Sequence, residues 1–68
     1  ELTFSENLRT LRRQEGLTQS ELAAKLNVTQ RKVAYWESGK IEPNLRDLWK
    51  ICDLFDVSAD FLMGRKKY

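Results

Sequence analysis

The sequence has no histidine, and its 68 residues include only one cysteine, one proline and three glycines. Histidine is the side chain whose charge changes most readily near neutral pH and the commonest metal ligand, so its absence removes the usual centre of acid–base and metal chemistry. A single cysteine, Cys52, cannot form a disulfide within the chain. Three acids lie near one another in the sequence, but two of them are expected at helix caps or first turns (Asp53, Asp56 and Asp60). We therefore expect no enzyme activity, no metal and no other cofactor.

Long hydrophobic runs and a strong excess of either charge are also absent. No apolar run approaches the roughly 18–20 residues that a membrane-spanning helix needs, and no secretory signal is visible. An unpaired thiol suits a reducing compartment, so we expect a cytoplasmic protein that does not bind membranes. The net charge is only +2, from 12 basic and 10 acidic residues. Evidence for nucleic-acid binding must therefore come from where the charges lie.

The length of the chain corresponds to one small domain. We expect residues 1–64 to form this domain and residues 65–68, Arg-Lys-Lys-Tyr, to be a basic tail or the start of a linker. The sequence does not begin with methionine, which fits a trimmed or excised domain. Whether a further domain follows Tyr68 is left open.

Five segments show apolar residues at helical spacing, bounded by residues typical of helix ends. The predicted helices cover residues 4–14, 19–26, 30–38, 45–55 and 59–63. Each is preceded by a residue that favours the N-cap, namely Thr3, Thr18, Thr29, Asn44 and Ser58. Capping boxes are predicted at Thr3–Glu6 and Thr18–Glu21. The apolar stripes predict a core of Phe4, Leu8, Leu11, Leu22, Ala23, Leu26, Val33, Trp36, Leu45, Leu48, Ile51, Cys52 and Phe55. We predict an all-α fold, a compact bundle of five short helices.

The second and third predicted helices are separated by only three residues, which requires a sharp turn. Asn27 tolerates the positive φ that such a turn needs. In the third helix, Val33 and Trp36 share one face and are expected in the core, while Arg31 and Tyr35 project on the opposite face. Long hydrogen-bonding side chains of this kind suit the base edges in a DNA major groove. The alternative is an ordinary solvated helix face.

The spacing of Leu22, Ala23, Leu26, Val28, Val33 and Trp36 resembles the helix-turn-helix of the Cro/repressor (XRE-like) family. The resemblance continues through G-K-I-E-P-N (residues 39–44) and D-V-S-A-D-F-L (residues 56–62), and so covers nearly the whole chain. Asn27 stands where many members have glycine. The resemblance implies a lambda-repressor-like bundle with the helix-turn-helix at helices 2 and 3. It also implies sequence-specific binding of double-stranded DNA by a prokaryotic or phage-type transcriptional regulator, in the simplest case a repressor.

Three side chains are the candidate base contacts. Arg31 suits a bidentate contact to guanine and Gln30 one to adenine. By the resemblance, Gln30, Arg31 and Tyr35 occupy positions that usually contact bases. The ring of Tyr35 suits a thymine methyl group or a sugar, and packing on the domain surface is the alternative for this side chain.

The candidate phosphate contacts surround these residues. Gln19 begins a helix, whose N-terminal N–H groups favour an anion, and by the resemblance it holds the DNA backbone. Lys32 is expected at a phosphate rather than a base. The resemblance adds Ser38, Lys40 and Asn44 as phosphate contacts, with Lys40 the strongest of the three. It also implies an ion pair between Arg12 and Glu37, the alternative being two unrelated surface charges.

Two apolar side chains of the fourth helix, Trp49 and Leu54, lie away from the centre of its apolar stripe. They are a candidate surface for a dimer or another partner. The resemblance implies a homodimer on a near-palindromic operator. A protein-interaction module of the same fold, such as an antitoxin that binds a toxin, is the main alternative, and RNA binding is a weaker one.

Overall fold

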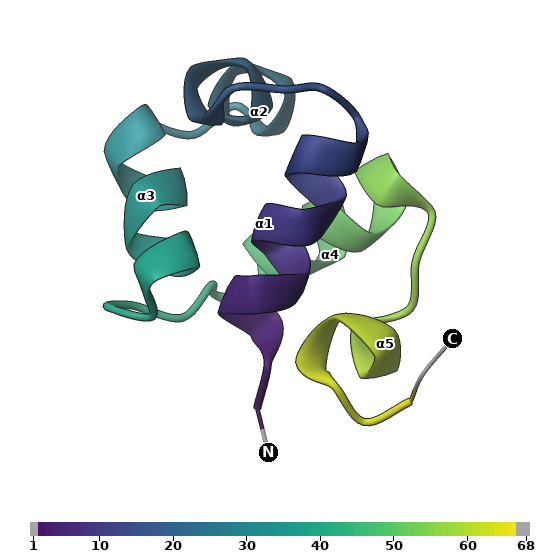
Figure 1. The fold of residues 1–68 in the computed structure, drawn as a ribbon. Coiled ribbons are helices and arrows are strands. Elements are labelled where there is room, and N and C mark those ends of the chain that lie inside the picture. Colours follow the sequence, from purple (N-terminus) through teal and green to yellow (C-terminus); the bar gives the residue numbers. More distant parts are fainter. Residues whose placement is uncertain (1, 67–68) are drawn as a thin grey trace.

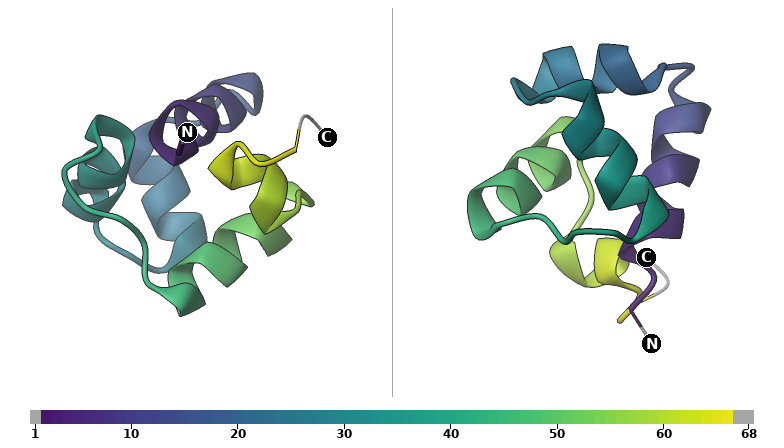
Figure 2. Two further views of the ribbon diagram at one scale, coloured as in Figure 1. Left: turned by 90° about the horizontal axis from the view of Figure 1, so that it is seen from below. Right: turned by 90° about the vertical axis from the view of Figure 1, so that its left-hand side faces the viewer.

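The computed structural model describes residues 2–66, which form five α-helices and no strand (Figure 1). The helices are α1 (Phe4–Gln14), α2 (Gln19–Leu26), α3 (Gln30–Ser38), α4 (Leu45–Phe55) and α5 (Ala59–Met63). α1 runs through the middle of the bundle, with α3 on one side of it and α5 on the other (Figures 1 and 2). α2 packs against α3 and α4, and α4 packs against α5. The predicted all-α fold and the predicted helix boundaries are confirmed.

Side-chain caps begin four of these helices. At α2 both hydrogen bonds of the capping box form, Glu21 N–H to Thr18 Oγ1 at 3.0 Å and Thr18 N–H to Glu21 Oε1 at 2.8 Å. Corresponding caps begin α3, α4 and α5 at Thr29, Asn44 and Ser58. Each cap gives a partner to a backbone N–H that has none within the helix, which explains why local sequence located these helix starts.

The capping box predicted at Thr3 is wrong. The φ and ψ angles of Thr3 are −118° and 25°, and its side chain accepts no hydrogen bond from a backbone N–H of α1. The Thr3 hydroxyl instead accepts from Asn7 Nδ2 at 3.0 Å, and the same nitrogen lies 3.1 Å and 3.0 Å from the carbonyl oxygens of Phe61 and Leu62. The Asn7 side chain, which joins α1 to α5, thus takes the place of the backbone donor of a local cap.

The buried core draws on all five helices. Leu8, Leu22, Val33, Ile51 and Leu62 are completely buried, one from each helix. Phe4, Ala23, Leu26 and Trp36 join them, and partly buried side chains including Leu11, Leu48, Cys52 and Phe55 pack around this set. Each large apolar side chain removed from water contributes roughly 1.5–3 kcal/mol to folding.

Leu45 does not belong to this core, although the sequence predicted it there. It is 83% exposed, while Ile51 further along the same helix is fully buried. Leu45 is the first residue of α4, and that first turn lies at the edge of the bundle, beyond the helices that pack on the rest of α4 (Figure 2). Helical spacing gives the face of a residue but not whether a neighbouring helix extends far enough to cover it.

The longest helices of the described part, α1 and α4, have 11 residues each. Within residues 2–66 no helix combines the length and the hydropathy that a membrane span requires.

Candidate nucleic-acid interface

The turn between α2 and α3 fixes how α3 is presented. Asn27 ends α2 in the left-handed conformation, with φ 57° and ψ 46°. The N–H of Val28 then donates to the Ala23 carbonyl at 3.0 Å, and the Thr29 hydroxyl accepts from Lys32 N–H at 3.1 Å to begin α3. These bonds let the chain reverse direction within three residues, so the two helices pack directly on each other.

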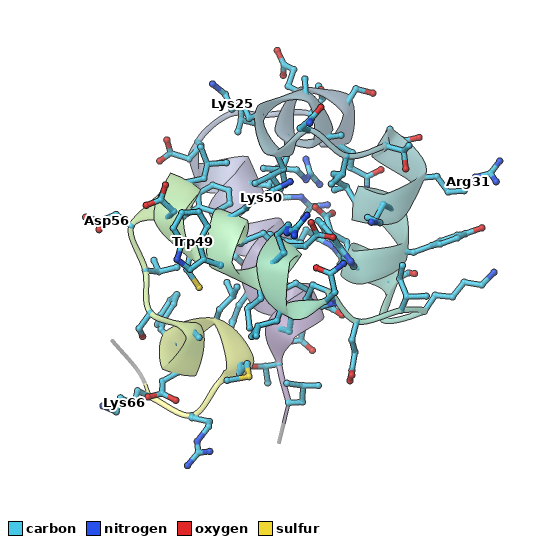
Figure 3. The ribbon with its side chains drawn as sticks, turned by 180° about the vertical axis from the view of Figure 1, so that it is seen from behind. Lys25, Arg31, Trp49, Lys50, Asp56 and Lys66 are labelled. Carbon is cyan, nitrogen blue, oxygen red and sulfur yellow. The ribbon has the colours of Figure 1, made fainter. Side chains whose placement is uncertain are left out.

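One face of α3 is fixed in the core and the other is uncovered. Val33 and Trp36 are 0% and 1% exposed, as predicted. Arg31 is exposed, and among residues 2–66 it has no ion pair or side-chain hydrogen bond. Figure 3 shows its side chain extended away from the bundle, and no other helix lies over the outer side of α3 in Figure 2. Gln30 and Ser38 are also exposed, and Tyr35 is half-buried.

Tyr35 and Lys40 lie together at the C-terminal end of α3. The Nζ atom of Lys40 lies 4.6 Å from the centroid of the Tyr35 ring, which is within the range of a cation–π contact. The Lys40 N–H also donates to the Tyr35 carbonyl at 2.9 Å, and Ser38 Oγ donates to the same carbonyl at 3.2 Å. An ammonium group, an aromatic ring and a hydroxyl are thus held on the same side of the molecule as Arg31.

Beneath this surface, Arg12 of α1 pairs with Glu37 of α3, as the resemblance implied. Arg12 Nε donates to Glu37 Oε2 at 2.6 Å, and a terminal guanidinium nitrogen donates to Oε1 at 3.0 Å. The hydrogen bond to the carboxylate raises the pKa of the Arg12 guanidinium. Arg9 donates to the Glu37 carbonyl at 2.7 Å, and its Nε atom lies 3.8 Å from Glu37 Oε1.

Gln19 and Gln30 continue this pair to the surface. Gln19 Nε2 donates to Glu37 Oε1 at 3.2 Å, and Gln30 Nε2 donates to Gln19 Oε1 at 2.8 Å. A continuous line of hydrogen bonds therefore runs from Arg12 to Gln30. It joins a predicted phosphate contact and a predicted base contact to a buried carboxylate.

Lys32 does not project with the exposed residues of α3, and its phosphate contact stays a prediction. Its Nζ atom donates to Asp47 Oδ2 of α4 at 3.2 Å, so the charge is directed toward a neighbouring helix. Asp47 is only 5% exposed and also lies 3.9 Å from Lys50 Nζ. Lys50 in turn donates to the Leu26 carbonyl at 3.1 Å. The need of a buried carboxylate for cationic partners accounts for the position of Lys32.

The remaining predicted residues are separated in space. Asn44 lies at the start of α4, where its Oδ1 accepts from Asp47 N–H at 2.7 Å. Trp49 is 67% exposed and Leu54 39% exposed. Figure 3 shows Trp49 on the outer side of α4. At 3.6 residues per turn Trp49 and Leu54 point about 140° apart, so they do not form one patch. The exposed neighbour of Trp49 one turn earlier is Leu45.

Sequence reasoning missed three residues of this region. None of Arg9, Asp47 and Lys50 was predicted to contribute to it. The single available signal was an acid at the third position of a helix, with lysines elsewhere in the chain. This pattern is too common to be specific.

Within residues 2–66, no group of three or more His, Cys, Asp or Glu side chains could hold a metal ion. In the predicted tail, Arg65 Nε lies 3.9 Å from Asp60 Oδ1 and Lys66 Nζ lies 3.9 Å from Asp60 Oδ2. Residues 67–68 of the predicted tail are outside the described part.

The sequence matches the family described as Helix-turn-helix over residues 8–62. It is 42% identical over 60 residues to the uncharacterized HTH-type transcriptional regulator YqaE of Bacillus subtilis, which covers 88% of this chain and 52% of that protein. It is 40% identical over 63 residues to the HTH-type transcriptional activator BcrR of Enterococcus faecalis, covering 93% of this chain and 31% of that one. The chain thus spans about half of the first relative and about a third of the second.

Solved structures share the fold. A transcriptional regulator from Listeria innocua has a TM-score of 0.88 at 38% identity, covering 94% of this chain and 60% of that chain. The P22 c2 repressor in complex with a synthetic operator has a TM-score of 0.87 at 24% identity, covering 97% and 98%, and at this identity it shows the fold alone. Part of the hydroxypropylphosphonic acid epoxidase from S. wedmorenis is also similar, with a TM-score of 0.78 at 33% identity, covering 88% of this chain and 32% of that one. The match over most of the chain, with an α2–α3 pair of the expected geometry, shows that this chain belongs to the Cro/repressor (XRE-like) helix-turn-helix family.

Proposed function

We propose that this domain binds double-stranded DNA sequence-specifically, with α3 in the major groove, and thereby regulates transcription. The observation that carries the proposal is the outer face of α3, which holds an exposed Arg31 while Val33 and Trp36 on the other face are buried. A major groove about 12 Å wide accepts one helix of this kind. Because Val33 and Trp36 fix the helix in the core, little backbone order has to be gained when DNA binds.

Three side chains are proposed to read bases. Arg31 presents a planar fork of donors, which matches the two acceptors of guanine. Gln30 presents a carboxamide, which matches the acceptor and donor of adenine. Tyr35 presents the edge of a half-buried ring, which suits a thymine methyl group or a sugar. One good bidentate contact discriminates between bases by about 1–3 kcal/mol.

A second set is proposed to hold the DNA backbone: Gln19, Ser38, Lys40 and Asn44. Lys40 is the leading member because its ammonium is exposed and is positioned over Tyr35, next to the reading face. Contacts of this kind fix the register of the protein on DNA without carrying sequence information. Lys32 is left out of the set because it pairs with Asp47.

We further propose that two copies bind a near-palindromic operator, with half-sites about 10 base pairs, or a multiple of that, apart. Repression by blocking access to a promoter is the simplest consequence, although the relative BcrR is named an activator. The exposed side of α4 around Trp49 is the proposed contact between the copies. A protein partner on the same side is the competing function, favoured by one observation, the 67% exposure of a tryptophan.

The test is selection of bound sequences from a random duplex pool, with Arg31→Ala, Lys40→Ala and Trp49→Ala compared to the parent. Arg31→Ala should relax the preference at one base position. Lys40→Ala should weaken binding to all sequences, and the slope of the logarithm of the binding constant against the logarithm of the salt concentration should fall by about one in magnitude. Trp49→Ala should leave base preference alone and lower self-association in sedimentation. Equal affinity of the parent for every duplex would reject the proposal. A stable complex with a protein partner that Trp49→Ala abolishes, without any DNA selectivity, would favour the competing function.

A further inference from the structure

Asp47 is a buried acid in the first turn of α4 that holds a lysine of α3. It is only 5% exposed, and its Oδ2 accepts from Lys32 Nζ at 3.2 Å. Lys50 Nζ lies farther away, at 3.9 Å from Asp47 Oδ1. Among residues 2–66, the Lys32 ammonium has no other hydrogen bond or ion pair. Lys32 is therefore the nearest cation to Asp47, and Asp47 is the one partner of Lys32 in the described part of the chain.

Lys32 lies at the edge of the exposed face of α3. It directly follows Arg31, so the two side chains point about 100° apart around the helix. The Lys32 side chain is 39% exposed, which means that it is not confined to the core. A lysine has a flexible four-carbon stem and an ammonium with three rotatable donors. A Lys32 side chain released from Asp47 is therefore free to turn toward a DNA phosphate beside α3.

We propose that Asp47 withholds Lys32 from the DNA backbone and so limits the sequence-independent part of binding, an inference that rests on the proposed function. Lysine contacts to phosphates supply essentially all non-specific affinity for DNA. Moving Lys32 to a phosphate would leave the buried Asp47 carboxylate with only the more distant Lys50 to compensate its charge. Loss of a partner by a buried charge costs more free energy than an exposed ion pair returns. Asp47 is thus a positioning residue, and Lys32 stays with it when DNA binds.

Lys50 is not available in the same way. Its Nζ also donates to the Leu26 carbonyl at 3.1 Å. Leu26 is the last residue of α2, where the partial negative charge of a helix end favours a cation. Neutralising Asp47 therefore leaves Lys50 with an acceptor but leaves Lys32 with no charged partner. The expected effect comes from one lysine, which a substitution can remove.

The decisive variant is Asp47→Asn, titrated with a duplex that the parent selects and with an unrelated duplex, from about 50 to 200 mM salt. The start of α4 should survive, because the Asn44 cap accepts from the backbone N–H of residue 47. Lys32 should now gain a phosphate. The slope of the logarithm of the binding constant against the logarithm of the salt concentration should therefore rise by about 0.9 in magnitude.

The same variant has two further readouts. Across this range of salt, its affinity for both duplexes should fall about three- to fourfold more than the affinity of the parent. Its base preference should be unchanged, because a phosphate contact carries no sequence information. A purely structural role of Asp47 would weaken binding, and it would not add a phosphate contact.

Matched double variants separate Lys32 from the general effect of charge. Asp47→Asn with Lys32→Met should return the slope to that of the parent. Asp47→Asn with Lys25→Met has the same net charge and should keep the raised slope. Lys25 is exposed, and Figure 3 shows it on the opposite side of the molecule from Arg31.

A single control addresses the loss of one negative charge. Asp60→Asn makes the same change in charge at an acid whose side chain is 45% exposed and which does not contact α3. It should leave the slope unchanged. Circular dichroism checks that each variant is folded. If Asp47→Asn is not, Lys32→Met alone keeps the inference testable, since it should leave the slope of the parent unchanged.

An unchanged or reduced slope in folded Asp47→Asn would overturn the inference, and so would a raised slope that persists when Lys32→Met is added. A slope reduced by Lys32→Met alone would also overturn it, because the lysine would then contact a phosphate in the parent. Each of these results leaves sequence selection by the parent, and with it the proposed function, intact. A parent that selects no sequence would instead reject the proposed function, and the inference would fail with it.

Discussion

Arg12 of α1 and Glu37 of α3 join through two hydrogen bonds, 2.6 Å from Nε to Oε2 and 3.0 Å from a terminal nitrogen to Oε1. Their side chains are 12% and 2% exposed, so neither charge has much access to water. The pair connects the central helix of the bundle to the helix that carries the candidate base contacts. Removing the Glu37 carboxylate leaves the Arg12 guanidinium, largely shielded from water, without an anionic partner.

We therefore expect Glu37→Gln to lower the free energy of unfolding by about 3–5 kcal/mol. Arg12 keeps its positive charge in this variant but loses the carboxylate. Urea denaturation followed by circular dichroism measures the effect. A matched control is the double substitution Arg12→Met with Glu37→Leu, which removes both charges and should cost less than Glu37→Gln alone. Equal midpoints for the parent and Glu37→Gln would contradict the expectation.

Lys32 and Lys40 are predicted to act differently although both are lysines at or next to α3. Lys32→Met should reduce stability by no more than about 1 kcal/mol, because the lysine is partly exposed, and should leave the salt dependence of DNA binding unchanged. Lys40→Met should leave stability unchanged. It should reduce the slope of the logarithm of the binding constant against the logarithm of the salt concentration by about one in magnitude. Binding titrations at several salt concentrations distinguish the two. A reduced slope for Lys32→Met would mean that the lysine leaves Asp47 when DNA binds.

The capping box of α2 predicts a pH dependence. The Thr18 N–H donates to the Glu21 carboxylate and lowers the pKa of that carboxyl. Because the folded pKa is the lowered one, the ionised carboxylate stabilises the fold above the ordinary glutamate pKa of about 4.3, and this contribution is lost as the pH falls through the lowered value. The stability difference between the parent and Glu21→Gln should therefore shrink from about pH 6 to about pH 3. Unfolding curves across that range check it, and a constant difference would be inconsistent with the hydrogen bond.

Leu22 and Leu45 provide a matched pair for the core, since one is completely buried and the other 83% exposed. Leu22→Ala should lower the free energy of unfolding by about 2–5 kcal/mol, the cost of lost burial and a cavity. Leu45→Ala should change it by no more than about 0.5 kcal/mol. Thermal or urea unfolding measures both. A large loss from Leu45→Ala would indicate that a second copy or another partner covers the first turn of α4 in solution.

Two departures from the sequence analysis involve contacts between helices. Thr3 was predicted to cap α1, but Asn7 takes its hydroxyl while reaching α5. Lys32 was predicted at a phosphate, but Asp47 of α4 holds it. In each case the contact depends on a helix distant in the sequence, α5 for Asn7 and α4 for Lys32.

By itself the sequence determined the five helices, the turn at Asn27 and the inward position of Val33 and Trp36. Caps, left-handed turn residues and apolar spacing act within about one helical turn, so they can be read without a fold. Only the tertiary structure decided that Leu45 is exposed, that Lys32 turns to α4, and that Gln30 is joined through Gln19 to Glu37. Those arrangements depend on which helices pack side by side and how far each one extends, because their hydrogen-bond and packing partners are brought together only by folding.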